Sequence, residues 1–378
     1  MGGTSRRDPE HCDTRKQRPR TEETKIERAE AYIGKGELSH AARELQAQEI
    51  APGNEATLRE LRDPALRPAR RSEPLPEALD NFAPSFLVAL DKTIFGETLR
   101  RCRKGQSGGI LGSRYKQFKL CLENEVAFDA LFAAAGKLAR AEVPQPIVDV
   151  MKTSALTALL KPNQRIRGIA SGDSFRRLVS KSLARQYQQE LRAAVYPHNV
   201  GMCDRSGTDT AIHAIRYLTD RYPDKVVISI DGVGAFDHVS RARMFEHLLS
   251  DPKLSSLVPF VRQWYGEDTQ YRWIDDTGAC HIIRQADGGE QGDSLMPALF
   301  CLGFHPALEE LHAELPVGAV LIAYLDDAYI VCNHSEVVDC VVLATNIFRL
   351  VSHIDVHLGK LAAWSRNICP PPERFVGL

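Results

Sequence analysis

Two short apolar stretches near the C-terminal end of the chain flank a pair of adjacent acids. The stretches, residues 319–325 and 328–332, are rich in β-branched and aromatic side chains. This composition predicts two strands joined by a tight turn. Asp326 and Asp327 then lie at the tip of a β-hairpin, where unpaired carboxylates are costly unless they meet a cation.

A second apolar run, residues 226–230, also leads directly into an acid, Asp231. Three carboxylates delivered from strand ends to one place suit a pair of hard divalent cations. Such pairs, about 4 Å apart, drive phosphoryl transfer in polymerases. The pattern therefore predicts a metal-dependent site of the kind carried by a polymerase palm.

The remaining pattern predicts an α+β fold, with an antiparallel palm sheet that carries these acids and is backed by helices. Helical periodicity at residues 127–139 and 175–195 indicates helical fingers. Before them, residues 24–49 predict a helical hairpin, and the prolines of residues 62–76 predict a linker. The resulting division is a disordered tail (1–23), a helical segment with the linker (24–79), fingers (80–225) and palm (226–378).

Composition adds loose bounds. The chain has 378 residues, 43% of them hydrophobic, and a formal net charge of −1, so a packed core is feasible and no partner class is excluded. Its nine cysteines lack zinc spacing, which favours reduced thiols. No signal peptide and no apolar stretch of the ~18 residues that a membrane helix needs is visible. We expect an intracellular protein, nuclear or cytoplasmic, without membrane contact.

The middle of the chain carries two basic stretches, residues 100–119 and 161–192. The second contains Lys161, Arg165, Arg167, Arg176, Arg177, Lys181, Arg185 and Arg192. Each stretch alone is typical of a solvated helix face. Because both precede the predicted acidic site, they also suit the walls around an anionic substrate.

Two further segments bear on the site. The polar, glycine-rich residues 288–293 precede an apolar helix, whose first backbone amides could face an anionic ligand. Another acid pair, Asp275 and Asp276, is followed by Thr277 and Gly278 between two strand-like runs. That pattern predicts an ordinary hairpin turn and no second metal site.

Taken in order, five segments resemble the reverse transcriptases of non-LTR, LINE-like retrotransposons. The resemblance covers residues 85 to 360 approximately. Its segments are residues 161–170 (KPNQRIRGIA), 231–237 (DGVGAFD), 290–293 (EQGD), 324–327 (YLDD) and 358–360 (LGK).

The resemblance implies an RNA-directed DNA polymerase that adds dNTPs to a primer 3′-hydroxyl on an RNA template. Its cofactor would be two Mg²⁺ ions, which Mn²⁺ can replace. Asp231 and Asp326 match the catalytic aspartates, with Asp327 in support and the Gly232 carbonyl as a further metal ligand. The other implied roles are a steric gate against the ribose 2′-hydroxyl (Phe236), the nucleotide pocket (Gln291, Gly292), triphosphate binding (Arg167, Lys161) and a general acid toward pyrophosphate (Lys360).

Departures from the family pattern keep two alternatives open. Ser294 stands where the family usually has proline, and Leu325 replaces a smaller or more flexible residue. Residues 361–378 are too few for a complete thumb, so we expect a palm-and-fingers fragment with the thumb largely missing. The alternatives are a non-catalytic retroelement remnant that only binds nucleic acid, and another palm polymerase such as an intron maturase. The aromatic ring of Phe236 argues against a palm polymerase that synthesises RNA.

Overall fold

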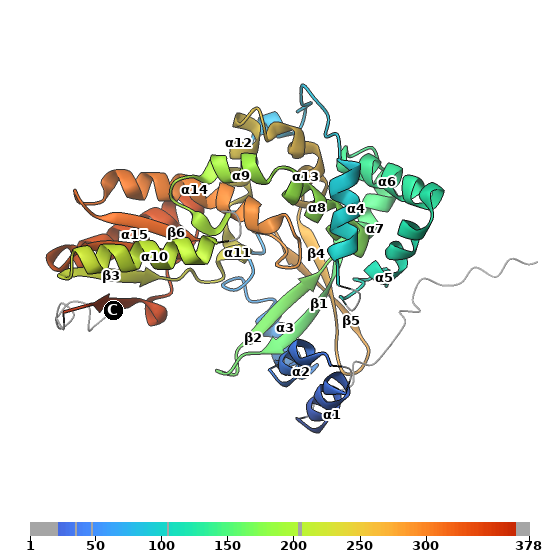
Figure 1. The fold of residues 1–378 in the computed structure, drawn as a ribbon, viewed down its shortest axis with the longest axis horizontal. Coiled ribbons are helices and arrows are strands. Elements are labelled where there is room, and N and C mark those ends of the chain that lie inside the picture. The colour runs from blue at the N-terminus through green and yellow to red at the C-terminus, as the bar shows by residue number, and fades with distance from the viewer. Residues whose placement is uncertain (1–21, 35, 47, 104–105, 203–205, 368–378) are drawn as a thin grey trace, which may run out of the picture.

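The computed structural model describes residues 22–34, 36–46, 48–103, 106–202 and 206–367 (Figure 1). Helices and two separate four-stranded sheets alternate along the chain. The predicted α+β class is confirmed. Within the described ranges, no helix is long and apolar enough to cross a membrane.

One sheet is antiparallel throughout and has the strand order β6-β7-β3-β8. Its strands are β3 (Lys225–Ile230), β6 (Val320–Tyr324), β7 (Asp327–Asn333) and β8 (Ala362–Ser365). The central strands β3 and β7 consist largely of buried apolar residues. This is the predicted sheet, and its hairpin β6–β7 carries the acid pair.

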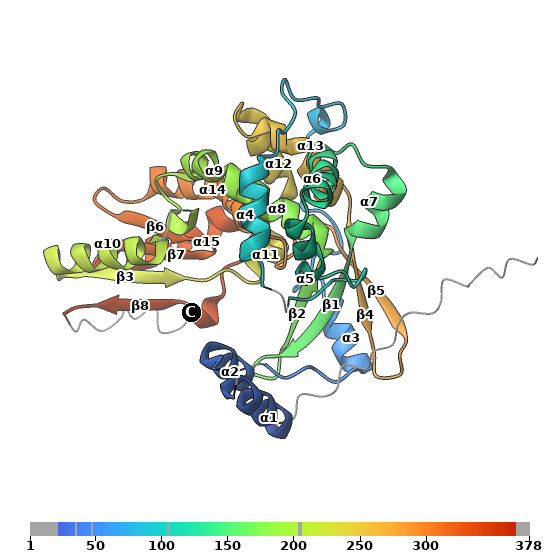
Figure 2. The same cartoon turned by 45° about the vertical axis from the view of Figure 1, so that its right-hand side comes forward.

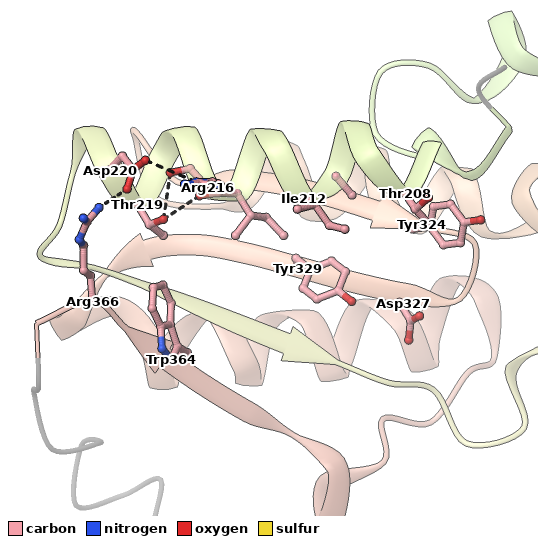
Figure 3. Close-up of a pocket in the computed structure, with 12 residues that line it drawn as sticks. Thr208, Ile212, Arg216, Thr219, Asp220, Tyr324, Asp327, Tyr329, Trp364 and Arg366 are labelled. Atoms are coloured by element: carbon pink, nitrogen blue, oxygen red, sulfur yellow. Dashed lines mark hydrogen bonds and ion pairs between the residues drawn. The ribbon is translucent and has the colours of Figure 1, made fainter. Parts of the chain in front are cut away.

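Helices cover both faces of this sheet. On β7, Ala328, Ile330 and Cys332 are fully buried in the main core, which also takes in α14 (Met296–Glu314) and α15 (Val337–Ser352). Because side chains alternate along a strand, Asp327 and Tyr329 point the other way. There they face α10 (Gly207–Arg221), which crosses the sheet above them (Figure 3).

The other sheet has the order β2-β1-β4-β5, and Figures 1 and 2 show it apart from the first sheet, to its right. Its strands are β1 (Thr153–Leu160), β2 (Ile166–Ser171), β4 (Thr269–Ile274) and β5 (Cys280–Gln285). The hairpins β1–β2 and β4–β5 are antiparallel, and β1 joins β4 in parallel. This sheet therefore combines two strands from the predicted fingers (80–225) with two strands from the predicted palm (226–378).

Helices pack between and around the two sheets. Those before β3 are α4 (Lys92–Arg101), α5 (Tyr115–Phe118), α6 (Glu125–Ala139), α7 (Gln145–Lys152), α8 (Ser174–Gln186) and α9 (Gln188–Val195). Those after it are α11 (Ala235–His238), α12 (Arg241–Ser250) and α13 (Val258–Tyr265). Short 3₁₀ turns are η1 (Glu77–Leu79), η2 (Lys119–Glu123), η3 (Val200–Met202), η4 (Ser255–Leu257), η5 (His334–Glu336) and η6 (Leu358–Lys360). Both predicted finger helices are confirmed, the second with a break at Tyr187.

The N-terminal helical hairpin is also present, as α1 (Glu22–Ile33) and α2 (Leu38–Leu45), followed by α3 (Glu55–Leu61). The predicted disordered tail lies outside the described residues, except that its last two positions, Glu22 and Glu23, already belong to α1. Ile50 pairs with Leu159, which attaches the hairpin to the end of β1. The prediction of disorder was therefore wrong for Glu22 and Glu23.

The proline-rich stretch predicted as a linker is fixed to the rest of the chain. Arg67 is only 6% exposed, and its Nε donates a hydrogen bond to Gln285 Oε1 at 2.9 Å. Its Nη2 lies 3.7 Å from Asp237 Oδ1. Five residues on, the Ser72 amide donates to Asp287 Oδ2 at 2.6 Å. Prolines predicted the absence of regular structure correctly, but they carried no signal for these long-range polar contacts.

Candidate active site

The hairpin β6–β7 turns through two residues, Leu325 and Asp326, between the paired Tyr324 and Asp327. Leu325 adopts a left-handed backbone conformation, with φ 54°, which tight two-residue turns require. The two acids therefore occupy the turn and the first position of β7. This is the placement that the sequence predicted.

Asp231 is brought to the same place by the neighbouring strand. The last residue pair of the β3–β7 ladder is Ile230 with Ala328, so one step further puts Asp231 beside Asp327. The Asp231 carbonyl accepts a hydrogen bond from the His357 amide at 2.7 Å. In the bridge between Gly232 and Val356, the hydrogen bonds are made by the residues on either side of Gly232. The Gly232 carbonyl therefore takes no part in them. The backbone thus brings all three predicted acids to the same end of the central strands.

In the electrostatics of these acids, burial and mutual repulsion outweigh the nearby positive charges for Asp326 and Asp327. Burial, and then the negative charges of Asp327 and Asp231, raise the pKa of Asp326. Burial and the charge of Asp231 likewise raise the pKa of Asp327, against a lowering effect of Lys360. Each carboxyl makes ionisation of its neighbour harder, so a nearby cation would stabilise all of them.

The donor chemistry fits a hard divalent cation, because the site offers carboxylate and carbonyl oxygens. Within the described ranges, no three acidic, histidine or cysteine side chains converge closely enough to hold a metal ion together. The Asp231 carboxylate is instead engaged by the Lys360 ammonium of η6. Lys360 therefore lies at the site, as predicted, and neutralises one of the three acids.

Cations from the hairpin β1–β2 face the same acids. Arg167 lies close enough to lower the pKa of both Asp326 and the buried Asp237, although burial raises the pKa of each overall. Lys161 has its pKa lowered by burial and then by the charges of Arg167 and Lys360. The three predicted cations therefore share one electrostatic neighbourhood with the acids.

The predicted nucleotide-pocket residues come from two other elements. Phe236, on the short helix α11, stacks on Phe300 with ring centroids 4.5 Å apart and an interplanar angle of 21°. Gln291 Nε2 donates to Asp237 Oδ2 at 3.4 Å. A Cβ on Gly292 would lie 2.4 Å from the carbonyl oxygen of Ala170 on β2, so only glycine allows this approach. The glycine-rich turn of residues 288–293 and α11 thus meet beside the hairpin β1–β2.

A comparison with protein-family models gives one match, to the reverse transcriptase (RNA-dependent DNA polymerase) family, over residues 160–368. This span is more than half of the chain and contains every predicted site residue. The chain belongs to the reverse transcriptase family. The predicted resemblance is thereby confirmed at the level of this family.

Individual relatives of this reverse transcriptase chain are distant. It is 25% identical over 254 residues to the retrotransposable element SLACS 132 kDa protein of Trypanosoma brucei gambiense, covering 66% of this chain and 21% of that protein. The chain thus spans about a fifth of that relative's length. Telomerase from Candida tropicalis, truncated from its C-terminal domain, has a TM-score of 0.44 and 12% identity, covering 58% of this chain and 51% of that one. Telomerase from Candida albicans in complex with telomeric RNA has a TM-score of 0.43 and 15% identity, covering 62% and 46%.

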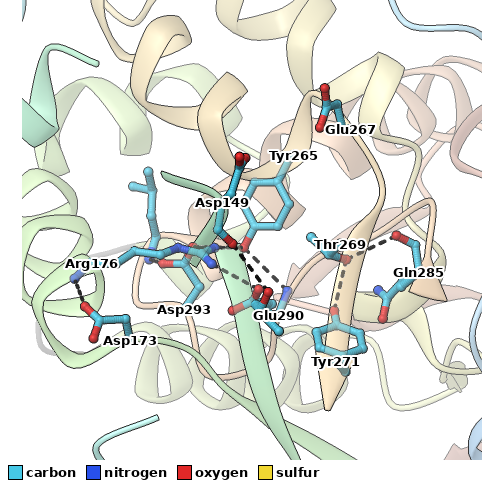
Figure 4. Close-up of polar contacts among 12 residues, drawn as sticks. Asp149, Asp173, Arg176, Tyr265, Glu267, Thr269, Tyr271, Gln285, Glu290 and Asp293 are labelled. Carbon is cyan, nitrogen blue, oxygen red and sulfur yellow. Dashed lines mark hydrogen bonds and ion pairs between the residues drawn. The ribbon is translucent and has the colours of Figure 1, made fainter. Parts of the chain in front are cut away.

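Beside the glycine-rich turn of residues 288–293 lies a buried ionic network (Figure 4). Arg176 of α8 is fully buried and contacts Glu290 Oε1 at 3.0 Å and Asp293 Oδ2 at 3.2 Å. The Tyr265 hydroxyl donates to the same Asp293 oxygen at 2.8 Å. These acids flank Gln291 and Gly292, so the network fixes the turn to α8 and α13. The basic stretch therefore predicted the environment of Arg176 wrongly, since its guanidinium faces acids in the interior and not phosphate.

A cavity of ≈ 710 Å³ opens between α10 and the sheet face that bears Asp327 (Figure 3). Its apolar walls include Ile212, Tyr329 and Trp364, and the ion pair between Arg366 and Asp220 closes the far end. Four elements contribute to these walls, so no local sequence pattern predicts the cavity. It places an aromatic surface directly beside one of the three acids.

Proposed function

We propose that this chain is an RNA-directed DNA polymerase that transfers nucleotides from dNTPs to a primer 3′-hydroxyl on an RNA template. The observation that carries the proposal is the placement of Asp231, Asp326 and Asp327 at the adjoining ends of β3 and the hairpin β6–β7. Burial, and then the negative charges of the neighbouring acids, raise the pKa of Asp326 and Asp327, which favours a bound divalent cation. Family membership supports the same reaction class.

Asp231, Asp326, Asp327 and the Gly232 carbonyl would hold two Mg²⁺ ions, or Mn²⁺ in their place. Bound there, such ions acidify the primer hydroxyl and neutralise the leaving pyrophosphate. The primer oxygen forms a bond to the α-phosphorus as it loses its proton to solvent water, and the bond from that phosphorus to the bridging oxygen of the pyrophosphate breaks.

The other residues of the site bind and orient the nucleotide in this proposal. Arg167 and Lys161 hold the triphosphate, and Gln291 with Gly292 lines the base and sugar pocket. The Phe236 ring, fixed by its stack on Phe300, blocks a ribose 2′-hydroxyl and so selects dNTPs. Lys360 must leave Asp231 to give its proton to the departing pyrophosphate, and its ion pair with Asp231 supports this role.

The test is primer extension by the whole chain on an RNA template with dNTPs and Mg²⁺ or Mn²⁺. The wild type is compared with Asp326→Ala and with a control, Asp339→Ala, an exposed acid of α15. We expect extension by the wild type and the control and none by Asp326→Ala.

Extension that survives in Asp326→Ala would overturn the proposal. Absence of extension in all three proteins, with template binding retained, would favour the alternative of a chain that only binds nucleic acid. Efficient use of ribonucleotides would instead contradict the role of Phe236.

A further inference from the structure

The turn that presents the acids contains a backbone conformation that leucine adopts rarely. Leu325, at φ 54°, immediately precedes Asp326. A branched side chain in the left-handed region is disfavoured unless its surroundings hold the backbone in place. The residue that holds this turn should therefore control where Asp326 and Asp327 point.

Asn199 makes the two hydrogen bonds that such a residue would need. Its Nδ2 donates to the Leu325 carbonyl oxygen at 3.0 Å, and its Oδ1 accepts from the Leu325 amide at 3.1 Å. One buried carboxamide, 3% exposed, thus satisfies both backbone polar groups of the strained residue. Leu325 lies between the paired positions of β6 and β7, so the strand ladder does not supply these partners.

The segment around Asn199 is itself held firmly. The Ala323 amide donates to the His198 carbonyl at 2.8 Å, and Asn199 forms a parallel bridge with Ala323. The His198 ring lies 4.7 Å from the ring of His312 on α14, measured between centroids. This segment therefore ties the catalytic hairpin to the long core helix.

A glycine allows the close approach. The Gly201 amide donates to Asn199 Oδ1 at 3.0 Å, which orients the carboxamide. A Cβ on Gly201 would lie 2.7 Å from the Leu325 amide nitrogen. Any side chain at this position would push the segment away from the turn.

We propose that Asn199 is a positioning residue for the proposed polymerase reaction, acting through the backbone of Leu325 on Asp326 and Asp327. The expected effect on the rate of dNTP addition rests on the proposed function. The expected effect on the order of the turn does not. Aspartate has the same shape as asparagine but cannot donate to the Leu325 carbonyl when ionised, and it adds a negative charge beside three acids. Alanine removes both hydrogen bonds without adding charge.

The structural test is hydrogen exchange of the whole chain, comparing wild type, Asn199→Asp and Asn199→Ala. The matched control is Asn124→Asp, which keeps an exposed helix cap on α6. We expect at least tenfold faster exchange of the peptide spanning residues 320–327 in both Asn199 variants. Exchange in the peptide spanning residues 225–230 should stay within twofold of wild type, which separates a loosened turn from general unfolding.

The kinetic test is the single-turnover rate of dNTP addition per active site. We expect the Asn199 variants to lose 10- to 100-fold in rate and to need more Mg²⁺ for half-maximal rate. The KM for dNTP and the affinity for primer–template should change less than threefold, a split that a merely structural role would not give.

Unchanged exchange at residues 320–327 would overturn the inference, and so would an unchanged single-turnover rate in an active protein. If the wild type shows no extension at all, the proposed function fails, while hydrogen exchange still decides whether Asn199 holds the turn. The two failures are therefore distinguishable.

Discussion

Two hairpins of this chain carry the same Asp-Asp pair, and the surroundings of the two pairs are opposite. In the hairpin β4–β5, Asp275 accepts hydrogen bonds from the Thr277 amide at 2.9 Å and from the Ala279 amide at 2.9 Å. It also contacts the His281 ring at 2.8 Å. These donors lower the pKa of the Asp275 carboxyl, first through His281 and then through the side chain of Thr277. The predicted ordinary turn is confirmed.

In the hairpin β6–β7 the two acids lie beside a third acid, whereas in the hairpin β4–β5 Asp275 lies beside hydrogen-bond donors. The neighbouring strand β3 delivers Asp231, and burial adds a desolvation cost, so the pKa of both Asp326 and Asp327 is raised. The Asp-Asp dipeptide alone therefore does not define a cation site. What matters is whether the turn supplies its own hydrogen-bond donors or a second strand supplies more carboxylate.

The largest effect should come from removing the third acid while leaving both hairpins intact. Asp231→Asn should lower the rate of primer extension more than about a thousandfold, equivalent to ~4 kcal/mol of activation free energy. Asp275→Asn, the matched change in the other hairpin, should alter the rate less than about twofold, since no step of the proposed reaction involves it. Single-turnover extension measures both. A similar loss of rate in the two variants would contradict the claim that only the acids beside the hairpin β6–β7 take part in the reaction.

A third pair of acids, Glu290 and Asp293, has different surroundings again, because both carboxylates contact the buried guanidinium of Arg176. Arg176→Met would leave two buried carboxylates without their partner, which typically costs about 3–5 kcal/mol. Urea unfolding should show this loss in the free energy of unfolding. Arg59→Met, at an exposed ion pair with Glu55, should cost no more than about 1 kcal/mol. Equal effects would mean that the burial of Arg176 is not what holds the turn.

These results also show which parts of the site could be predicted from sequence. Asp231, Asp326 and Asp327 each end or begin a short apolar run, so a local pattern predicted both their position and their meeting. Asn199 and Arg176 have no such pattern. One is a polar residue outside any regular strand, and the other belongs to a basic stretch that resembles a solvated helix face. Their roles depend on contacts with Leu325, Glu290 and Asp293, more than a hundred residues away, which no local periodicity encodes.

The pH dependence of stability should have opposite signs in the two hairpins when no divalent cation is present. A raised pKa in the folded state means that Asp326 destabilises the fold as pH rises above its unfolded pKa of about 3.9. Asp326→Asn should therefore gain stability relative to wild type on going from pH 3 to pH 6. Asp275 has a lowered pKa, so its stabilisation is present above about pH 3.9 and is lost as pH falls.

Asp275→Asn should accordingly lose stability relative to wild type over the same rise in pH. Thermal unfolding of the three proteins in the presence of a chelator measures these differences. The same sign in both variants would contradict the assignment of the Asp326 carboxyl to a repulsive cluster.

The smallest effect should come from Asp276, the second acid of the hairpin β4–β5. Its Oδ2 accepts a hydrogen bond from the Gly53 amide at 2.8 Å, which links the hairpin to the N-terminal segment. Asp276→Ala should lower the free energy of unfolding by about 0.5–1.5 kcal/mol and leave extension unchanged. Asp339→Ala, which removes an exposed acid of α15, serves as the control in the same urea titration. A loss of extension in Asp276→Ala would show that this hairpin takes part in the reaction.

The most direct test of the central claim is Mn²⁺ binding, followed by electron paramagnetic resonance, in the presence of RNA template, primer and an unreactive dNTP analogue. Three proteins are compared: wild type, Asp326→Asn and Asp275→Asn. We predict bound Mn²⁺ in the wild type and in Asp275→Asn, and its loss in Asp326→Asn. Equal binding in all three proteins, or none in the wild type, would contradict the claim that β3 and the hairpin β6–β7 together form the cation site.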